Sequence, residues 1–344
     1  MNTVIQVVQH LRPGGIETMV LDLVAFCEQD NRTFIVSLEG TKDSAILHWP
    51  KLQTVADKLV FLDKEPGLAP SLIFSMRKLF KKLEADVVHT HHIGPLLYAG
   101  VAARLAGVRQ LIHTEHDAWH LNDPRRRILE RMVIRLARPR LVADAETVAG
   151  NMRTHLKTDQ IQVIPTGIDT QRFTPGDQAE ARQRLGLPQG VLLIGCSGRL
   201  EKVKGQRLLI DALTRLPENI HLALAGTGST EARLRRQAEA FRLGNRVHFL
   251  GRIDEMPTFY HSLDVFCLPS LNEGLPLSPL EAQACNIQTL VTDVGGSRET
   301  LCPNSGQLAP GGDASAMAST LDRMLRKPPA ITPREFVQRR HDVR

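Results

Sequence analysis

The chain has 344 residues, of which 42% are hydrophobic, 23% are charged and only 4% are aromatic. This length is too great for one ordinary hydrophobic core and suits two domains of average size, and the composition excludes a disordered chain. The formal charge of +6 favours anionic partners. Aromatic residues are too few for a base-stacking surface, so we expect no nucleic-acid partner.

The cysteines and the apolar stretches bear on where the protein works. Five cysteines form no CxxC pair and leave one over from any pairing, which favours a reducing compartment. The amino-terminal segment lacks a basic region and turns polar too soon for a signal peptide. The longest apolar stretch is too short to cross a bilayer. We therefore expect a cytoplasmic protein that is not integral to a membrane.

Apolar runs alternate with helical patterns along almost the whole chain, which predicts an α/β fold with parallel sheets. In the first half, strands are expected at residues 3–8, 33–38, 59–62, 86–89, 110–113, 140–143 and 161–164. In the second half, they are expected at residues 191–196, 220–225, 246–250, 264–268 and 288–292. Prolines and glycines break the chain between the two sets and predict a hinge at Pro165–Gly176. We expect an N-terminal domain over 1–167, a C-terminal domain over 168–330 and a last helix within 331–344.

Gly14 and Gly15 end the first predicted strand and open a helix near Ile16. Paired glycines let the backbone approach a phosphate or a sugar without obstruction by a side chain. The pattern is not GxGxxG, so a nicotinamide site is not expected.

Six histidines cluster at the ends of the successive predicted strands 86–89 and 110–113: His89, His91, His92, His113, His116 and His120. Such clusters are common metal ligands, and this spacing invites a metal interpretation. The chain has no pair of aspartates in the DxD arrangement that clamps a metal against a diphosphate.

A basic segment at residues 124–140 carries seven arginines against one acid, Glu130. Its apolar residues recur at helical spacing and are Ile128, Leu129, Met132, Val133 and Leu136. We expect a solvated basic helix whose apolar face packs on its own domain. The alternative is a surface that rests on anionic lipid or receives an anionic acceptor.

In the second half, Arg199 and Lys204 follow the strand at 191–196, just before a helix that should begin near Gly205. Ligands of open α/β sheets bind at this edge, and two cations beside a helix N-terminus suit a diphosphate. The alternative is that both side chains are solvated surface cations. The following turn contains Gly226, which permits either a close ligand approach or a sharp turn.

Two carboxylates, Glu273 and Glu281, flank the segment EGLPLSPLE. Ser278 is a good N-cap and Glu281 lies three residues later, so a helix should begin here and present free amides to the preceding loop. The alternative is that Glu281 only closes a capping box and that Glu273 is solvated. The run QTLVTDVGGSRE then predicts a strand, a glycine turn and another helix start.

The segments GRLEKVKG, EGLPLSPLE and VGGSRE together resemble the C-terminal half of the retaining glycosyltransferases of family 4, the group 1 enzymes typical of bacterial polysaccharide synthesis. The resemblance implies a GT-B fold, in which two Rossmann-like domains face a central cleft and a last helix can return to the N-terminal domain. Three positions depart from the usual pattern: Thr166 replaces Asn, while Asn286 and Gln288 replace Gly and Pro.

The resemblance also implies roles for individual residues. Arg199 and Lys204 would neutralise the leaving diphosphate, Glu273 would bind hydroxyls of the donor sugar and Glu281 those of the ribose. His116 would touch the sugar without a metal, with Asp117 beside it. The remaining donor-binding positions would be Gly14, Gly15, Gly226, Arg252, Ile253, Gly274, Leu275, Pro276 and Leu277.

The implied reaction moves a hexose from a nucleotide-diphosphate sugar to a hydroxyl of a glycan or lipid-linked acceptor, with retention at the anomeric carbon. The leaving diphosphate would itself remove the acceptor proton. No metal and no cofactor are expected, and UDP-sugars are expected slightly ahead of GDP-sugars. Two alternatives remain: a nucleotide-sugar epimerase of similar fold, and a noncatalytic nucleotide-sugar binding protein.

Overall fold

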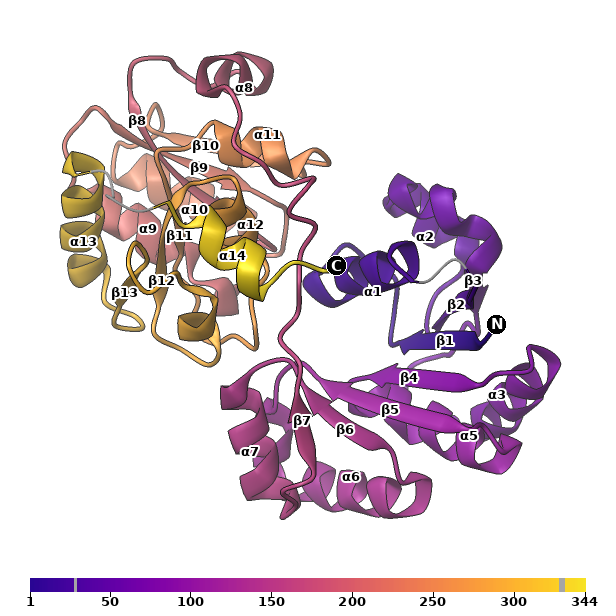
Figure 1. Ribbon diagram of the computed structural model, residues 1–344. Helices are drawn as coiled ribbons and strands as arrows, with labels where there is room; N and C mark the ends of the chain where they lie inside the picture. The colour runs from indigo at the N-terminus through magenta and orange to yellow at the C-terminus, as the bar shows by residue number, and fades with distance from the viewer. Residues whose placement is uncertain (28–29, 328–331) are drawn as a thin grey trace. The chain divides into compact units, whose positions relative to one another are not determined.

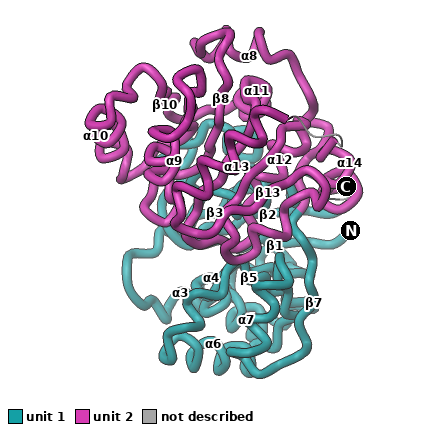
Figure 2. The backbone as a smooth tube through the Cα atoms, turned by 90° about the vertical axis from the view of Figure 1, so that its left-hand side faces the viewer, with its two compact units in different colours: residues 1–166 teal, residues 167–344 magenta. Residues whose placement is uncertain are grey.

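The computed structural model describes residues 1–27, 30–327 and 332–344. The chain divides into two compact units, Met1–Thr166 and Gly167–Arg344 (Figure 2). The boundary lies one residue before the predicted one. Among the described residues, no helix combines the length and the apolar character needed to cross a membrane.

Unit 1 is built on one parallel sheet whose strand order is β3-β2-β1-β4-β5-β6-β7 (Figure 1). Its strands are β1 (Thr3–Val8), β2 (Arg32–Ser37), β3 (Leu59–Phe61), β4 (Val87–His91), β5 (Gln110–Glu115), β6 (Arg140–Ala143) and β7 (Ile161–Val163). Each strand lies within two residues of its predicted bounds. A sheet with both faces covered needs nearly continuous apolar strands, and that pattern made them visible in the sequence.

Helices cover both faces of this sheet. They are α1 (Gly15–Ala25), α2 (Lys42–His48), α3 (Ser71–Lys82), α4 (Ile93–Pro95), α5 (Val101–Ala106), α6 (Pro124–Ala137) and α7 (Glu146–Leu156). On one face, α3 and α5 pack Met76, Phe80 and Ala102 against Ile5 and Val88 of the sheet. On the other face, α1 and its neighbours form a second core around the following residues: Val8, Val20, Val24, Ile35 and Leu52.

Unit 2 repeats the design with strand order β10-β9-β8-β11-β12-β13. Its strands are β8 (Leu192–Ser197), β9 (Ile220–Ala225), β10 (Val247–Gly251), β11 (Val265–Leu268), β12 (Gln288–Thr292) and β13 (Gln307–Ala309). Sequence analysis missed β13, because three residues at a sheet edge leave no apolar run. The prediction of an α/β fold with two parallel sheets is confirmed.

Two layers of helices sandwich the second sheet. The helices are α8 (Gln178–Leu185), α9 (Gln206–Leu213), α10 (Glu231–Ala240), α11 (Met256–His261), α12 (Ser278–Ala284), α13 (Ala314–Arg326) and α14 (Arg334–Arg340). The core on one face joins α9, α10 and α13, and the core on the other joins α11, α12 and α14. Neighbouring strand residues such as Leu193 and Ile194 enter opposite cores, as the period of two in a strand requires.

Both sheets follow the strand order 3-2-1-4-5-6 of doubly wound folds. The connections diverge between β1 and β4 in unit 1, and between β8 and β11 in unit 2. Ligands of such sheets bind beyond the carboxyl ends of the strands at this switch point. Residues that follow β1, β4, β8 and β11 are therefore the first candidates for a functional site.

The last helix, α14, is counted with unit 2 rather than as a separate segment; Ile331, where the expected segment began, lies outside the described residues. The guanidinium of Arg334 donates hydrogen bonds to the carbonyls of Thr170 (2.8 Å), Phe173 (2.6 Å) and Ala284 (2.5 Å). A helix of seven residues has little stability alone, so these contacts and the burial of Val337 hold it.

The basic helix α6 corrects one expectation. Four of its five predicted core residues are exposed, namely Ile128, Leu129, Met132 and Leu136. The buried face consists instead of Glu130, Val133 and Ala137. Ala137 packs against the backbone of Gly100, and Glu130 pairs with His120, so close packing and a buried ion pair select the face rather than hydrophobicity.

Candidate functional site

Lys204 and Glu273 meet at the switch point of unit 2. Lys204 lies in the short 3-10 helix Lys202–Lys204 after β8, and Glu273 follows the adjacent strand β11. The distance from Lys204 Nζ to Glu273 Oε1 is 2.6 Å, and Ser270 Oγ donates to the same oxygen at 2.6 Å. Only 7% of Glu273 is exposed, so the carboxylate is fixed rather than solvated. A charge-assisted bond of this length holds both side chains in one geometry.

Arg199 lies in the same loop as Lys204 but is exposed. Its guanidinium makes no hydrogen bond or ion pair with any other residue of the described chain, whereas its carbonyl accepts a bond from Gln206 Nε2 at 2.9 Å. The backbone of the loop is thus anchored while the cation stays available. Helix α9 begins directly after this loop, and its N-cap is Gly205, whose lack of a side chain leaves the first amides uncapped.

A buried tyrosine fixes the orientation of the Glu281 carboxylate. Tyr260 donates its hydroxyl to Glu281 Oε2 at 2.6 Å and lies 3.1 Å from Ser197 Oγ at the end of β8. Burial, and then the adjacent carboxylate, raises the pKa of Tyr260 well above its usual value, so the hydroxyl remains a donor. Helix α12 begins at Ser278 with Leu277 as its N-cap, so Ser278 is not the cap that the sequence predicted.

The other predicted donor-site residues differ in what their side chains do. Leu275 and Pro276 are buried, and Leu277 and Ile253 pack partly against the core. Arg252 is exposed and donates to Asp254 Oδ1 at 2.7 Å. The carbonyl of Gly274 accepts a bond from the amide of Gly296 at 3.0 Å, and Gly226 packs against the carbonyl of Gly198. At these positions the loop backbone, rather than accessible side chains, shapes the predicted site.

Gly295 permits the loop that carries Glu273 to close. Its φ is +53°, and a Cβ built there would lie 1.8 Å from the carbonyl oxygen of Glu273. We expect Gly295→Ala to lower turnover, because the clash displaces Glu273, and to cost at least about 1–2 kcal/mol for the left-handed conformation. Gly186→Ala is the control, since its φ is +64° with open space around it. Equal turnover in both variants, measured beside thermal denaturation, would contradict the prediction.

In unit 1, a chain of buried hydrogen bonds crosses the carboxyl ends of four strands. His91 Nε2 lies 2.9 Å from Gln6 Oε1, and His91 Nδ1 lies 3.0 Å from His116 Nε2. His116 Nδ1 in turn lies 2.9 Å from Asp144 Oδ2. Both ring nitrogens of His116 are therefore engaged within the protein, and only 7% of the residue is exposed. The sequence pattern did not reveal Asp144, whose pKa burial raises although His116 opposes this.

His92 is the more accessible imidazole at this edge. It follows β4 with a φ of +69°, a strained conformation for a residue with a side chain, and such strain is concentrated at functional sites. His92 Nδ1 lies 2.5 Å from Glu115 Oε1, and Nε2 lies 3.9 Å from Asp117 Oδ2. Burial lowers the pKa of His92, but the Glu115 carboxylate outweighs this and raises it to about 9. The sequence placed His92 in the cluster without singling it out.

The glycine pair after β1 opens α1 as predicted, with Gly14 as its N-cap. A Cβ built on Gly14 would lie 2.3 Å from Glu17 Oε2, so the absence of a side chain makes room for this nearly buried carboxylate. Glu17 Oε1 also lies 3.2 Å from His10 Nδ1. The glycines thus bring an acid to the switch point between β1 and β4.

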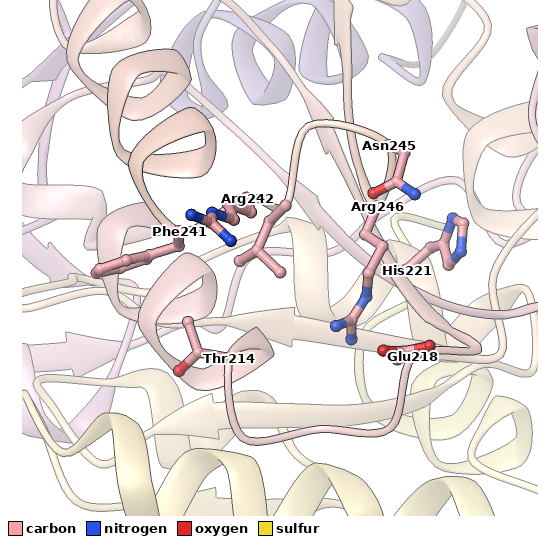
Figure 3. A pocket seen from close by; sticks show the side chains of 8 residues that line it. Thr214, Glu218, His221, Phe241, Arg242, Asn245 and Arg246 are labelled. Atoms are coloured by element: carbon pink, nitrogen blue, oxygen red, sulfur yellow. The ribbon is translucent and has the colours of Figure 1, made fainter.

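A pocket lies at the opposite edge of the second sheet (Figure 3). It is formed by the segments that lead into the amino ends of β9 and β10 and is lined by Thr214, Glu218, His221, Phe241, Arg242, Leu243, Asn245 and Arg246. The Arg246 guanidinium donates to the carbonyls of Ile220 and Pro217, at 3.0 and 2.8 Å, so its hydrogen bonds close the loop. The pocket thus lies at the edge of the sheet opposite the switch point of unit 2, and none of the predicted site residues lines it.

Comparison with known proteins accounts for both units. The family model for group 1 glycosyl transferases matches residues 177–341, and the model for glycosyltransferase family 4 matches residues 13–172. The chain belongs to glycosyltransferase family 4. It is therefore a glycosyltransferase, and the recognition made from its motifs is confirmed.

Relatives of this glycosyltransferase include a GDP-mannose-dependent monoacylated alpha-(1-6)-phosphatidylinositol monomannoside mannosyltransferase of Corynebacterium glutamicum, 25% identical over 92% of this chain and 86% of the relative. A D-inositol 3-phosphate glycosyltransferase of Xylanimonas cellulosilytica is 32% identical over 70% of this chain, which spans 63% of that relative. The crystal structure of Anabaena HepE in complex with UDP and glucose superposes with a TM-score of 0.85 at 20% identity, covering 100% of this chain and 96% of HepE. The GT-B fold class is thereby confirmed.

Proposed function

We propose that this glycosyltransferase moves a hexose from a nucleotide-diphosphate sugar to a hydroxyl of a glycan or lipid-linked acceptor, with retention at the anomeric carbon, in polysaccharide or glycolipid synthesis. The observation that carries the proposal is the pairing of Lys204 with buried Glu273, together with the guanidinium of Arg199 in the same loop as Lys204, which has no partner among the described residues. These groups lie beyond β8 and β11, where a doubly wound sheet binds its ligand.

The chemistry follows from the charges of these groups. As the glycosidic bond breaks, negative charge grows on the diphosphate, and Arg199, Lys204 and the uncapped amides of α9 stabilise it. The diphosphate takes the acceptor proton on the same face of the sugar, so no protein side chain needs to act as a strong base. Glu273, with both partners in place, binds the sugar hydroxyls, and Glu281, oriented by Tyr260, binds the ribose. Arg199 and Lys204 thus supply the positive charge at the diphosphate that a metal ion would otherwise supply.

A UDP-sugar is the donor we propose first, and GDP-mannose is its main competitor because the mannosyltransferase of C. glutamicum is named for that donor. A thermal-shift screen of UDP-, GDP- and ADP-sugars tests this choice, because a specific ligand stabilises the folded state by mass action. The stabilising donor, labelled in its sugar, is then incubated with the enzyme. Release of free nucleoside diphosphate, with the transferred or hydrolysed sugar in its original anomeric configuration, is the expected result.

Two outcomes of the same assay would replace the proposal. A new nucleotide sugar without free nucleoside diphosphate would identify an epimerase. Stabilisation without any turnover, hydrolysis included, would identify a noncatalytic binding protein. Addition of Mg²⁺ should leave the rate unchanged, whereas strong activation by Mg²⁺ would contradict the proposed role of Arg199 and Lys204.

We also propose that α6 rests on an anionic membrane while the acceptor is bound. Its exposed apolar residues form one stripe along the helix, and Ile128, Met132 and Leu136 are exposed by 57%, 62% and 59%. Arg125 and Arg135, both exposed, lie beside this stripe. Apolar residues flanked by arginines on one helix face are typical of interfacial binding to acidic lipids.

Flotation with vesicles of phosphatidylcholine and phosphatidylglycerol tests the membrane contact. The double variant Met132→Ser/Leu136→Ser should lose most of the bound fraction, and changing Arg125 and Arg135 to Gln should weaken binding more at low than at high salt. Changing Arg127 to Gln is a control, because its side chain faces His155 of the same unit. Binding that is undiminished in both test variants would discard the idea.

A further inference from the structure

Three buried side chains of unit 1 converge on one region. One ligand atom each of His113, Glu115 and Glu130 lies within 4.8 Å of the other two, and all three residues are fully buried. His113 Nε2, Glu115 Oε2 and Glu130 Oε1 have no hydrogen-bond partner among the described residues. Buried polar atoms without partners are rare and costly, and three that belong to one group of side chains need a physical explanation.

Each of these residues is fixed by a bond on its other polar atom. His113 Nδ1 lies 3.0 Å from Thr90 Oγ1, and Glu115 Oε1 lies 2.5 Å from His92 Nδ1. Glu130 Oε2 lies 2.5 Å from His120 Nε2. Metal ligands are characteristically oriented in this way, by an outer partner on the atom that does not touch the metal.

The hydrogen bonds of Thr90 bear on what His113 presents to the cluster. Thr90 Oγ1 lies 3.3 Å from the carbonyl of Ile112 and 3.0 Å from His113 Nδ1, and when it donates to the carbonyl it accepts from Nδ1–H of His113. In the neutral ring, Nε2 then carries a lone pair, which lies 3.6 Å from Glu115 Oε2. His120 Nε2 bonds Glu130 Oε2 and lies 3.8 Å from Glu115 Oε2, beyond hydrogen-bond distance. The imidazole lone pair and the two carboxylates thus form an electron-rich group that a cation would stabilise.

We propose that His113, Glu115 and Glu130 bind one divalent first-row transition-metal ion, such as Zn²⁺, in the interior of unit 1. One imidazole nitrogen and two carboxylate oxygens form a ligand set that suits Zn²⁺ or Mn²⁺, and the imidazole disfavours Mg²⁺ and Ca²⁺. The ion would tie α6, through Glu130, to β5. It departs from the expectation of no metal, but it has no part in neutralising the diphosphate, for which Arg199 and Lys204 remain the proposed groups.

A second set of residues, His92, Glu115 and Asp117, shares one member with this cluster. It fits a metal less well, because His92 and Asp117 are only partly buried and His92 Nδ1 already bonds Glu115 Oε1. Asp117→Asn therefore distinguishes the two sets, since it removes a ligand from the second and leaves the first complete.

The test measures metal content and does not depend on sugar transfer. The full-length protein is stripped with a chelator, titrated with Zn²⁺, Mn²⁺, Mg²⁺ or Ca²⁺, and analysed by elemental mass spectrometry and thermal denaturation. We expect one equivalent of Zn²⁺ or Mn²⁺ and a rise in Tm for the wild type and Asp117→Asn. Substitution with Co²⁺ should produce visible absorption bands of a coordinated ion. A folded wild type that retains none of the transition metals would overturn the proposal.

Glu130→Gln keeps the shape of the side chain and should weaken Zn²⁺ binding by more than about 100-fold, beyond the loss typical of outer-shell residues. Thr90→Val, which preserves volume, should weaken it by about 10- to 100-fold, and it serves if Glu130→Gln fails to fold. His221→Gln is the control for binding at surface histidines, because His221 and His248 form a stacked pair in unit 2. Zn²⁺ retained in Glu130→Gln or Thr90→Val but lost in His221→Gln would place the ion elsewhere.

Discussion

Changing Arg199 or Lys204 to Ala is expected to slow turnover by about 10²- to 10³-fold, the usual loss when one charge-stabilising group is removed from a reaction. Each side chain would face charge that develops only as the diphosphate leaves, so the effect should appear in kcat as well as in kcat/KM. Steady-state assays with the donor selected by thermal shift measure both constants.

The two variants should differ in stability, because the two cations differ in their surroundings. Lys204 neutralises the nearly buried carboxylate of Glu273, so its removal should lower Tm. Arg199 has no ionic partner among the described residues, and its removal should leave Tm unchanged. Lys202→Ala, an exposed lysine in the same short helix as Lys204, is the matched control and should retain full activity. Turnover within threefold of wild type in Arg199→Ala and Lys204→Ala would refute the assigned roles.

Arg182→Ala is expected to cost unit 2 about 3 kcal/mol of stability, the lower end of the range for removal of one member of a buried ion pair. Only 3% of Arg182 is exposed, and its guanidinium reaches the carbonyls of Ser262 and Val191 at 2.9 Å each and Asp264 Oδ2 at 2.7 Å. The variant leaves these acceptors without their donor. Since about a quarter of the Asp264 side chain is exposed, water offsets part of the loss.

Arg184→Ala provides the comparison for Arg182→Ala on the same helix. Arg184 is 66% exposed and pairs with Glu180 one turn away, a kind of contact that contributes less than about 1 kcal/mol. Urea denaturation of both variants should show a clear loss of stability only for Arg182→Ala. A loss of similar size for both residues would show that the helix, rather than the buried ion pair, is responsible.

The layers and the order of the elements could be predicted from the amino-acid sequence. A strand buried on both faces needs a continuous apolar run, and a helix that packs on a sheet needs apolar residues at helical spacing. Both patterns are visible within a short stretch of sequence, so both kinds of element could be located. The switch point of unit 2 could also be predicted from the sequence. Two strands that are adjacent in a doubly wound sheet are followed by polar residues, namely Arg199, Lys204 and Glu273. Short elements such as β13 carry too few residues for a pattern and were missed.

The tertiary structure alone decided which polar groups pair and which apolar residues stay exposed. The sequence gives no sign that Glu130 is buried against His120, that Asp144 holds His116, or that Tyr260 orients Glu281. These partners lie between 10 and 28 positions apart on different elements, so no local period relates them. The stripe on α6 is exposed for the same reason: helical spacing defines a face, but only the packing of neighbouring elements determines whether that face is covered.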